Sequence, residues 1–422
     1  MRGAAQDARS WRNLFTLTTA AFVGYTGFTL VMPFLPIYIS QLGVQDVGEV
    51  AMWSGLSLGV TPALTALLSP AWGRLADRVG RKLMLERALA SFVVVMTLMA
   101  FVRRPWQVFA LRAVQGLFAG YGGLTIAMAA ESAPRERMPA AIGMVQSAQR
   151  LGPAIGPVIG GVLAGLVGLR RAFLVTAGVY ALALALAVVL YVEPRTRRAS
   201  GEERGMGTGS RDILRLPNFA LLLAVIFGIQ YADRSLAPIL PLYVVGLGVP
   251  TGRAPLVSGL LFSVVACAAA VGHNLGGRLL KRMTARDLIT LGSTVAGAAI
   301  VGFALGHDIL ALGVAIGAFG LGVGLAMTAA FTAAGLVVPV GANATAFGFL
   351  NGAALAALAV SPVLSGIIGG SSMPAVFALD VAIAALVVLG VRRWMLEPGG
   401  HPQQRGGETL PPESQAESPD PL

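Results

Sequence analysis

Twelve stretches of mostly apolar residues dominate this chain, each near the length of about 20 that a helix needs to cross a bilayer core. Because lipid offers a backbone no hydrogen-bond partners, such stretches are expected to be helical. They cover residues 14–38, 50–73, 83–102, 106–130, 140–163, 172–192, 219–245, 256–275, 288–305, 309–338, 342–368 and 375–391. Only 12% of the residues are charged, against roughly 25% in soluble folds, so the sequence predicts an all-α polytopic membrane protein.

Basic residues collect in alternate connections, which predicts the topology. The connections after the odd-numbered windows hold five of the 31 Lys and Arg residues, namely Arg103, Arg104, Arg170, Arg171 and Arg253. Most of the others lie in the N-terminal segment, the alternate connections and the C-terminal tail. By the positive-inside rule, both termini are expected in the cytoplasm. The net charge of +11 therefore reflects membrane topology and not nucleic-acid binding, because no single basic stripe carries it.

The longest polar connection, residues 193–216, divides the chain into two six-helix halves, 14–192 and 217–393. Residues 1–13 are expected as a cytoplasmic tail, and residues 394–422 have a disordered composition. The halves repeat: MPFLPIYISQLG at 32–43 returns as APILPLYVVGLG at 237–248. Parallel repeats of six helices are a transporter architecture with the substrate site between the halves. We therefore expect two pseudo-symmetric six-helix bundles.

A short charged loop with the sequence GRLADRVGRKLML, residues 73–85, connects the second and third windows. Its glycines permit a tight turn, and its acidic and basic residues can meet a helix end or the anionic leaflet. The loop resembles the signature GxLxDRxGRKxxL of the major facilitator superfamily. The resemblance implies that the loop governs the switch between inward-open and outward-open states. The residues concerned are Gly73, Asp77, Arg78, Gly80 and Arg81.

The fourth window contains LRAVQG at 111–116, which is similar to the RxxxG-type signature of the fourth helix in the same superfamily. It places Arg112 within a membrane span. An arginine there either faces a partner or a wet cavity, or it lies close enough to an interface for its charge to reach water.

The fifth window contains RLGPAIGPVIGG at 150–161, which resembles the GxxxGPxxGG motif of the antiporter branches of this superfamily. The four-residue spacing of its glycines lines one helix face with small residues, and its prolines bend the helix. The resemblance favours export over import. The motif residues are Gly152, Pro153, Gly156, Pro157, Gly160 and Gly161.

Charged residues inside the predicted spans are the candidates for ion coupling. Asp233, beside Arg234, is the first candidate for a protonatable carboxylate, and a fixed ion pair that holds two helices together is the alternative. Glu131 and Asp380 are further candidates, although Glu131 can equally end the fourth helix at the surface. The first window has no charge, whereas several drug antiporters carry an acidic residue there.

Polar and aromatic residues in the predicted cavity-lining helices are candidates for substrate contact. They are Tyr25, Gln115, Tyr121, Gln146, Gln149, Gln230, Tyr231 and Asn351. Their amphipathic mix favours moderately apolar or cationic compounds over sugars or phosphates, and helix packing is the alternative role for each.

No metal-spaced cluster, phosphate-binding loop or activated nucleophile is recognisable, so we expect no enzyme, cofactor or metal site. The sequence predicts a monomeric secondary transporter of the cell membrane, in a bacterium the inner membrane. It would export small amphipathic compounds in exchange for protons. A transporter of one metabolite, such as a sugar, amino acid or siderophore, and a non-transporting membrane sensor are the alternatives.

Overall fold

The computed structural model describes residues 2–134, 137–193, 213–306, 308–338 and 343–396. Within these ranges each of the twelve predicted windows is mostly helical, and the first, fourth and seventh are broken at residues 31–34, 119–120 and 236–239. The helices of the first half are α1 (Arg2–Leu30), α2 (Leu35–Ser40), α3 (Val47–Val79), α4 (Arg81–Met99), α5 (Pro105–Phe118), α6 (Tyr121–Ser132), α7 (Met138–Val167) and α8 (Leu169–Leu190). Those of the second half are α10 (Phe219–Ser235), α11 (Leu240–Gly246), α12 (Ala254–Leu279), α13 (Ala285–Leu305), α14 (Ile309–Val337), α15 (Asn343–Ser371) and α16 (Met373–Trp394).

In the described part of the chain, nine helical spans are long and apolar enough to cross a membrane, one of them made of α5 and α6 together. α10 with α11, bent by 41°, can form a tenth crossing. The first and third windows are helical but less apolar. α1 is rich in threonine and stops before a break at residues 31–34. α4 carries four charges near its start, which shorten its apolar stretch. They are Arg81, Lys82, Glu86 and Arg87.

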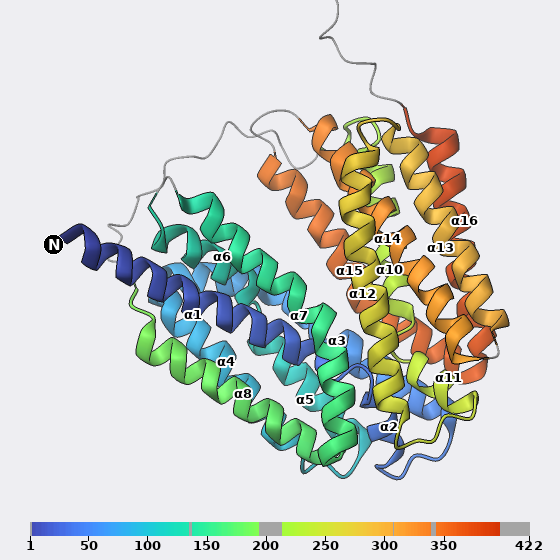
Figure 1. Cartoon of the computed structure of the whole chain (residues 1–422), viewed down its shortest axis with the longest axis horizontal. Helices are drawn as coiled ribbons and strands as arrows, with labels where there is room; N and C mark the ends of the chain where they lie inside the picture. The colour runs from blue at the N-terminus through green and yellow to red at the C-terminus, as the bar shows by residue number, and fades with distance from the viewer. Residues whose placement is uncertain (1, 135–136, 194–212, 307, 339–342, 397–422) are drawn as a thin grey trace, which may run out of the picture.

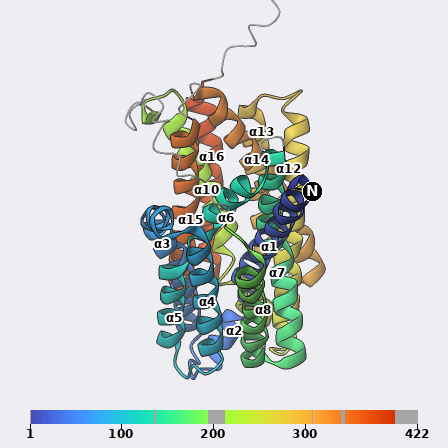
Figure 2. The same cartoon turned by 90° about the vertical axis from the view of Figure 1, so that its left-hand side faces the viewer.

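The helices form two groups, α1–α8 and α10–α16 (Figure 1). The groups meet through two helix pairs, α3 with α15 and α7 with α12, and α2 also contacts α11 (Figure 2). In Figure 1 the ribbons of the two groups come together at the end that holds α2 and α11, and they diverge toward the end that holds the N-terminus.

The repeat read from the sequence has the same packing in both halves. Tyr38 and Tyr243 occupy equivalent positions in the repeated segment. The Tyr38 ring lies 5.0 Å from that of Phe173 on α8, and the Tyr243 ring lies 5.5 Å from that of Phe377 on α16. Phe173 and Phe377 are therefore equivalent too, which aligns α8 with α16.

The two groups approach so closely because glycines replace larger side chains where they meet. A Cβ atom on Gly366 of α15 would lie 2.5 Å from the Ala51 carbonyl oxygen of α3, and one on Gly161 of α7 would lie 2.5 Å from the Pro255 oxygen of α12. Real Cβ atoms do not come this near to a backbone oxygen, so only glycine permits these helix distances. We call the two contacts, α3 with α15 and α7 with α12, the seam.

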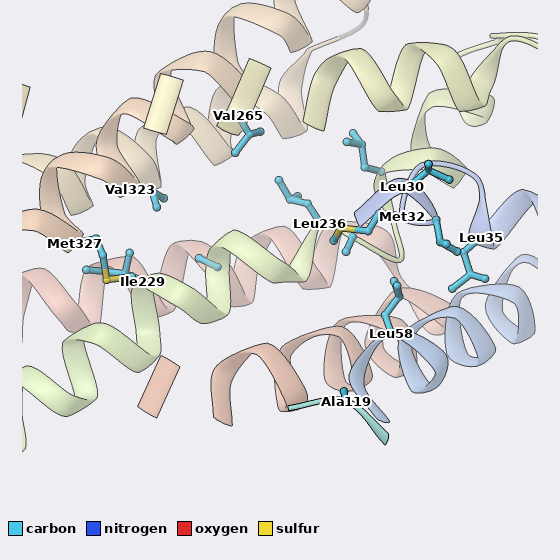
Figure 3. Close-up of a cluster of buried hydrophobic side chains, with 14 of the residues drawn as sticks. Leu30, Met32, Leu35, Leu58, Ala119, Ile229, Leu236, Val265, Val323 and Met327 are labelled. Carbon is cyan, nitrogen blue, oxygen red and sulfur yellow. The ribbon is translucent and has the colours of Figure 1, made fainter. Parts of the chain in front are cut away.

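Buried apolar side chains from both groups form one cluster (Figure 3). Leu30, the last residue of α1, and Met32, in the break that follows, lie beside Leu236 of the second half. Leu58 of α3 lies below them in this view. The seam uses residues 48–59 of α3, which are remote from the end of α3 at Val79. The halves are thus packed together at the end opposite the loop at residues 73–85.

Candidate functional site: gating loop, buried arginine and helix seam

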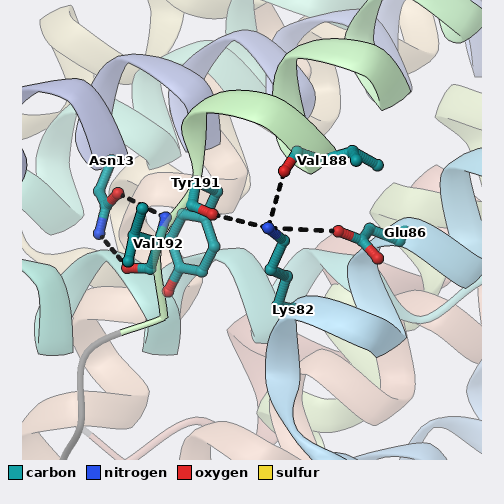
Figure 4. A network of polar contacts seen from close by, with 6 residues as sticks. All are labelled: Asn13, Lys82, Glu86, Val188, Tyr191 and Val192. Carbon is teal, nitrogen blue, oxygen red and sulfur yellow. Dashed lines mark hydrogen bonds and ion pairs between the residues drawn. The ribbon is translucent and has the colours of Figure 1, made fainter.

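The loop predicted to govern gating is fastened to the end of α8. Lys82 donates hydrogen bonds to the carbonyl oxygens of Val188 and Tyr191, both at 2.8 Å, and Asn13 of α1 exchanges two hydrogen bonds with the backbone of Val192 (Figure 4). The adjacent backbone N–H of Arg81 donates to Glu193 Oε1 at 2.8 Å. The start of α4, the end of α8 and α1 therefore form one polar cluster within the first half.

Gly80 makes the turn between α3 and α4 possible. Its φ of +105° lies in a region that side-chain-bearing residues rarely adopt, so the glycine predicted for a tight turn is required there. Arg81 forms an ion pair with Glu131 at 2.8 Å, which joins α4 to the end of α6. Glu131, a predicted coupling candidate, is thus placed beside the loop at residues 73–85. Arg78 and Gly73 are exposed, and the side chain of Asp77 lies outside what the structure describes.

Arg112 is completely buried in α5 and has no carboxylate within ion-pair distance in the described ranges. Its Nη1 donates to Gln115 Oε1 at 2.7 Å and its Nε donates to the Ser57 carbonyl oxygen of α3 at 3.2 Å. The guanidinium also lies 5.1 Å from the Phe28 ring, and Nη2 has no hydrogen-bond partner. The side chain therefore faces protein and does not reach toward an interface.

The antiporter-type motif of α7 packs against both halves. Gly152 lies against the Thr26 backbone of α1, where an added Cβ would come within 2.8 Å of the Thr26 nitrogen, and Gly156 and Gly160 continue the same contact toward Leu30. Gly161 and Pro157 instead face α12, where Ser263 Oγ donates to the Ala154 carbonyl oxygen at 2.7 Å. The motif thus joins α1, α7 and α12.

Asp233 and Arg234, adjacent on α10, form an ion pair with each other at 3.0 Å and are both partly exposed. This pair lies within one helix and does not join two helices, unlike the ion pair considered from the sequence. Asp233 and Arg150 of α7 both lie within electrostatic range of His273 on α12, whose Nδ1 is 2.9 Å from Thr328 Oγ1. Arg150 and His273 are exposed and were not among the predicted site residues, although each interrupts an apolar window.

Asp380 of α16 is completely buried. The distance from its Oδ2 to Ser235 Oγ, at the end of α10, is 2.5 Å, and its Oδ1 has no hydrogen-bond partner. Ser235 was not singled out from the sequence, because 145 positions separate it from Asp380.

The predicted substrate-contact residues fall into two groups. Gln115, Tyr121 and Tyr231 are buried, and Gln149 donates to the Gly122 carbonyl oxygen at 2.9 Å, which joins α7 to α6. Gln146 and Asn351 are exposed, and Tyr25 and Gln230 are half-buried. Only the second group is free to meet a ligand without rearrangement.

Residues 17–351 match the family model of the Major Facilitator Superfamily. The chain is 37% identical over 273 residues to the multidrug resistance protein MdtG of Serratia proteamaculans, 64% of this chain and 66% of that protein. It is 33% identical over 284 residues to the multi-drug resistance efflux pump PmrA homolog of Lactococcus lactis, 67% of this chain and 69% of that protein. The aligned segments therefore span about two thirds of these relatives.

Among solved structures, the chain is similar to a bacterial homolog of the human lysosomal transporter Spinster in its inward-facing, unoccupied conformation. The TM-score is 0.77 with 17% identity, covering 92% of this chain and 99% of that one. At this identity the likeness concerns the fold alone. The family match over most of the chain, the membrane-spanning helices and the shared fold agree, and the chain is therefore a multi-pass cell-membrane protein that belongs to the major facilitator superfamily of transporters.

Proposed function

We propose that this chain exports small amphipathic or cationic compounds in exchange for protons, as a monomer without enzymatic activity. The observation that carries the proposal is the seam, where backbones touch through glycines at one end of the molecule while the ribbons diverge at the other. A contact built from small, unbranched surfaces can separate and re-form, which suits rocking of one half against the other around a central site.

The direction of opening follows from the predicted topology. If the basic loop at residues 73–85 faces the cytoplasm, the seam closes the outer side and the structure is open inward. In that state the exposed residues Gln146, Arg150 and His273 on α7 and α12 are accessible to compounds from the cytoplasm. The relatives named as multidrug proteins support export of amphipathic or cationic compounds.

The proposal is tested by efflux of a panel of cationic and neutral dyes from cells that express the chain, with the proton gradient intact or collapsed. Cells with an empty vector and cells with Gly178→Ala serve as controls, because nothing lies within 4 Å of a Cβ at Gly178. We expect efflux that stops when the gradient collapses. Dye uptake, or no movement of any dye, would contradict the proposal and favour a transporter of one metabolite.

A further inference from the structure

The buried pair formed by Asp380 and Ser235 has too few partners for an ionised carboxylate. Ser235 Oγ lies 2.5 Å from Asp380 Oδ2 and 2.9 Å from the Ala232 carbonyl oxygen, but a serine hydroxyl has one hydrogen to donate. If Asp380 is protonated, it donates to Ser235, and Ser235 donates to Ala232. If Asp380 is ionised, one of these two contacts has no hydrogen and Oδ1 remains unpaired.

Among the residues that the structure describes, no positive charge on the helices around Asp380 forms an ion pair with it. α10 presents Tyr231, whose buried hydroxyl is unpartnered and within electrostatic range of Asp380, and Arg234, which is paired with Asp233. The described part of α15 has no titratable residue. On α13 the charged residues are in the first turn, where Arg286 donates to the Arg392 carbonyl oxygen, three turns along α16 from Asp380. An unpaired buried carboxylate costs several kcal/mol.

The internal repeat shows that the fold does not require this polar pair. Thr176 on α8 and Asp380 on α16 each follow the equivalent phenylalanine, Phe173 or Phe377, by three positions. Leu30 and Ser235 are also equivalent, because each lies two residues before the repeated segment of its half. Thr176 is buried and satisfied within its own helix by the Ala172 carbonyl oxygen at 2.8 Å. The same helix contact therefore forms without a carboxylate, so Asp380 serves something other than packing.

The Asp380–Ser235 pair lies beside the break between α10 and α11. Ser235 is the last residue of α10, and the chain continues as α11 only after a break that contains Pro238 and a bend of 41°. Proline-containing breaks are where helices bend. A cavity of about 20 Å³ between α10, α13, α14 and α16 lies one turn from the pair and is lined almost wholly by apolar residues, Ala232 and Ala384 among them.

We propose that Asp380 binds the coupling proton and that its protonation state sets the position of α11 relative to α10; this inference rests on the proposed proton antiport. Uptake of a proton forms the neutral acid, which the buried geometry accommodates. Release of the proton to the cytoplasm leaves a carboxylate that Ser235 alone cannot satisfy, so the end of α10 moves and the break changes its angle.

Two measurements test the proposal separately from transport. The first is infrared spectroscopy of the purified wild type and Asp380→Asn between acidic and alkaline pH. We expect the C=O band of a protonated carboxylic acid to disappear with rising pH in the wild type and to be absent in the variant at every pH. A wild-type spectrum without a band that Asp380→Asn removes would overturn the assignment of the proton to Asp380.

The second measurement uses proteoliposomes that contain the wild type, Asp380→Asn, or Thr176→Val as the matched variant in the first half. Asp380→Asn should retain exchange of labelled dye across the membrane but lose accumulation driven by a proton gradient, whereas Thr176→Val should retain both. Gradient-driven accumulation by Asp380→Asn would contradict coupling through this residue. If the wild type itself shows no gradient-driven accumulation, the proposed function fails, and the infrared result still decides whether Asp380 is the buried acid.

Discussion

Replacing Gly55 by alanine should favour the conformation in which the seam is open. In the closed seam, a Cβ on Gly55 would collide with the Pro362 carbonyl oxygen and would lie 3.0 Å from the Gly366 Cα. Both obstacles are backbone atoms, which cannot rotate away, so α3 and α15 must separate. Overpacking of this kind costs about 1–3 kcal/mol.

The cost applies only where α3 and α15 touch, so it changes the balance between the two conformations. A difference of about 1–3 kcal/mol corresponds to a shift of roughly 5- to 150-fold toward the state with the seam open. Gly178→Ala on α8 is the matched control, because the same Cβ there meets nothing within 4 Å.

The shift is measurable by cysteine labelling. The background carries Cys267→Ser, which removes the single cysteine of the chain, and Ser258→Cys, a completely buried position beside the seam glycine Gly259. A membrane-impermeant maleimide added from the seam side should label the reporter faster in Gly55→Ala than in the control. Equal labelling rates in the two variants, with both eluting as folded protein, would refute the view that glycine contacts close this side.

Three further predictions concern single side chains. Arg112→Leu should abolish dye efflux without lowering the thermal unfolding temperature, because a buried arginine itself costs about 2.5–3.5 kcal/mol in a span. If dye efflux and the unfolding temperature both fall, Arg112 has a structural role through Gln115. Tyr180→Phe should lose the hydrogen bond from its hydroxyl to the Gly24 carbonyl oxygen (3.0 Å) and about 0.5–1.5 kcal/mol of unfolding free energy in denaturant titrations. Lys82→Met should speed amide hydrogen exchange at the end of α8 while changing stability by no more than about 1 kcal/mol, since the Lys82 ammonium is partly exposed. An unchanged exchange rate would show that the hydrogen bonds from Lys82 to the end of α8 are not maintained.

Several features of this protein follow from its sequence because they depend on local composition. Apolar stretches of bilayer length must be helical, since lipid leaves the backbone no other partner. The loop at residues 73–85 was recognisable from its own order of glycines and charges, and Gly80 occupies the strained backbone conformation that this order predicts. The repeat of residues 32–43 at 237–248 was likewise readable from the sequence, and the structure adds that Tyr38 and Tyr243 make matching contacts with phenylalanines in the two halves.

Only the tertiary structure decided which polar side chains meet. Sequence reasoning put Asp233 first among the carboxylates, but its neighbour Arg234 pairs with it, whereas Asp380 is buried against Ser235 on another helix. Burial and pairing depend on how each helix is rotated about its axis and which helix lies beside it. The hydropathy of the sequence determines neither the rotation of a helix nor its neighbour, because a membrane-spanning helix is apolar on nearly all sides. The partners of Arg112 and the glycine contacts of the seam were undetermined for the same reason until the helices were placed in space.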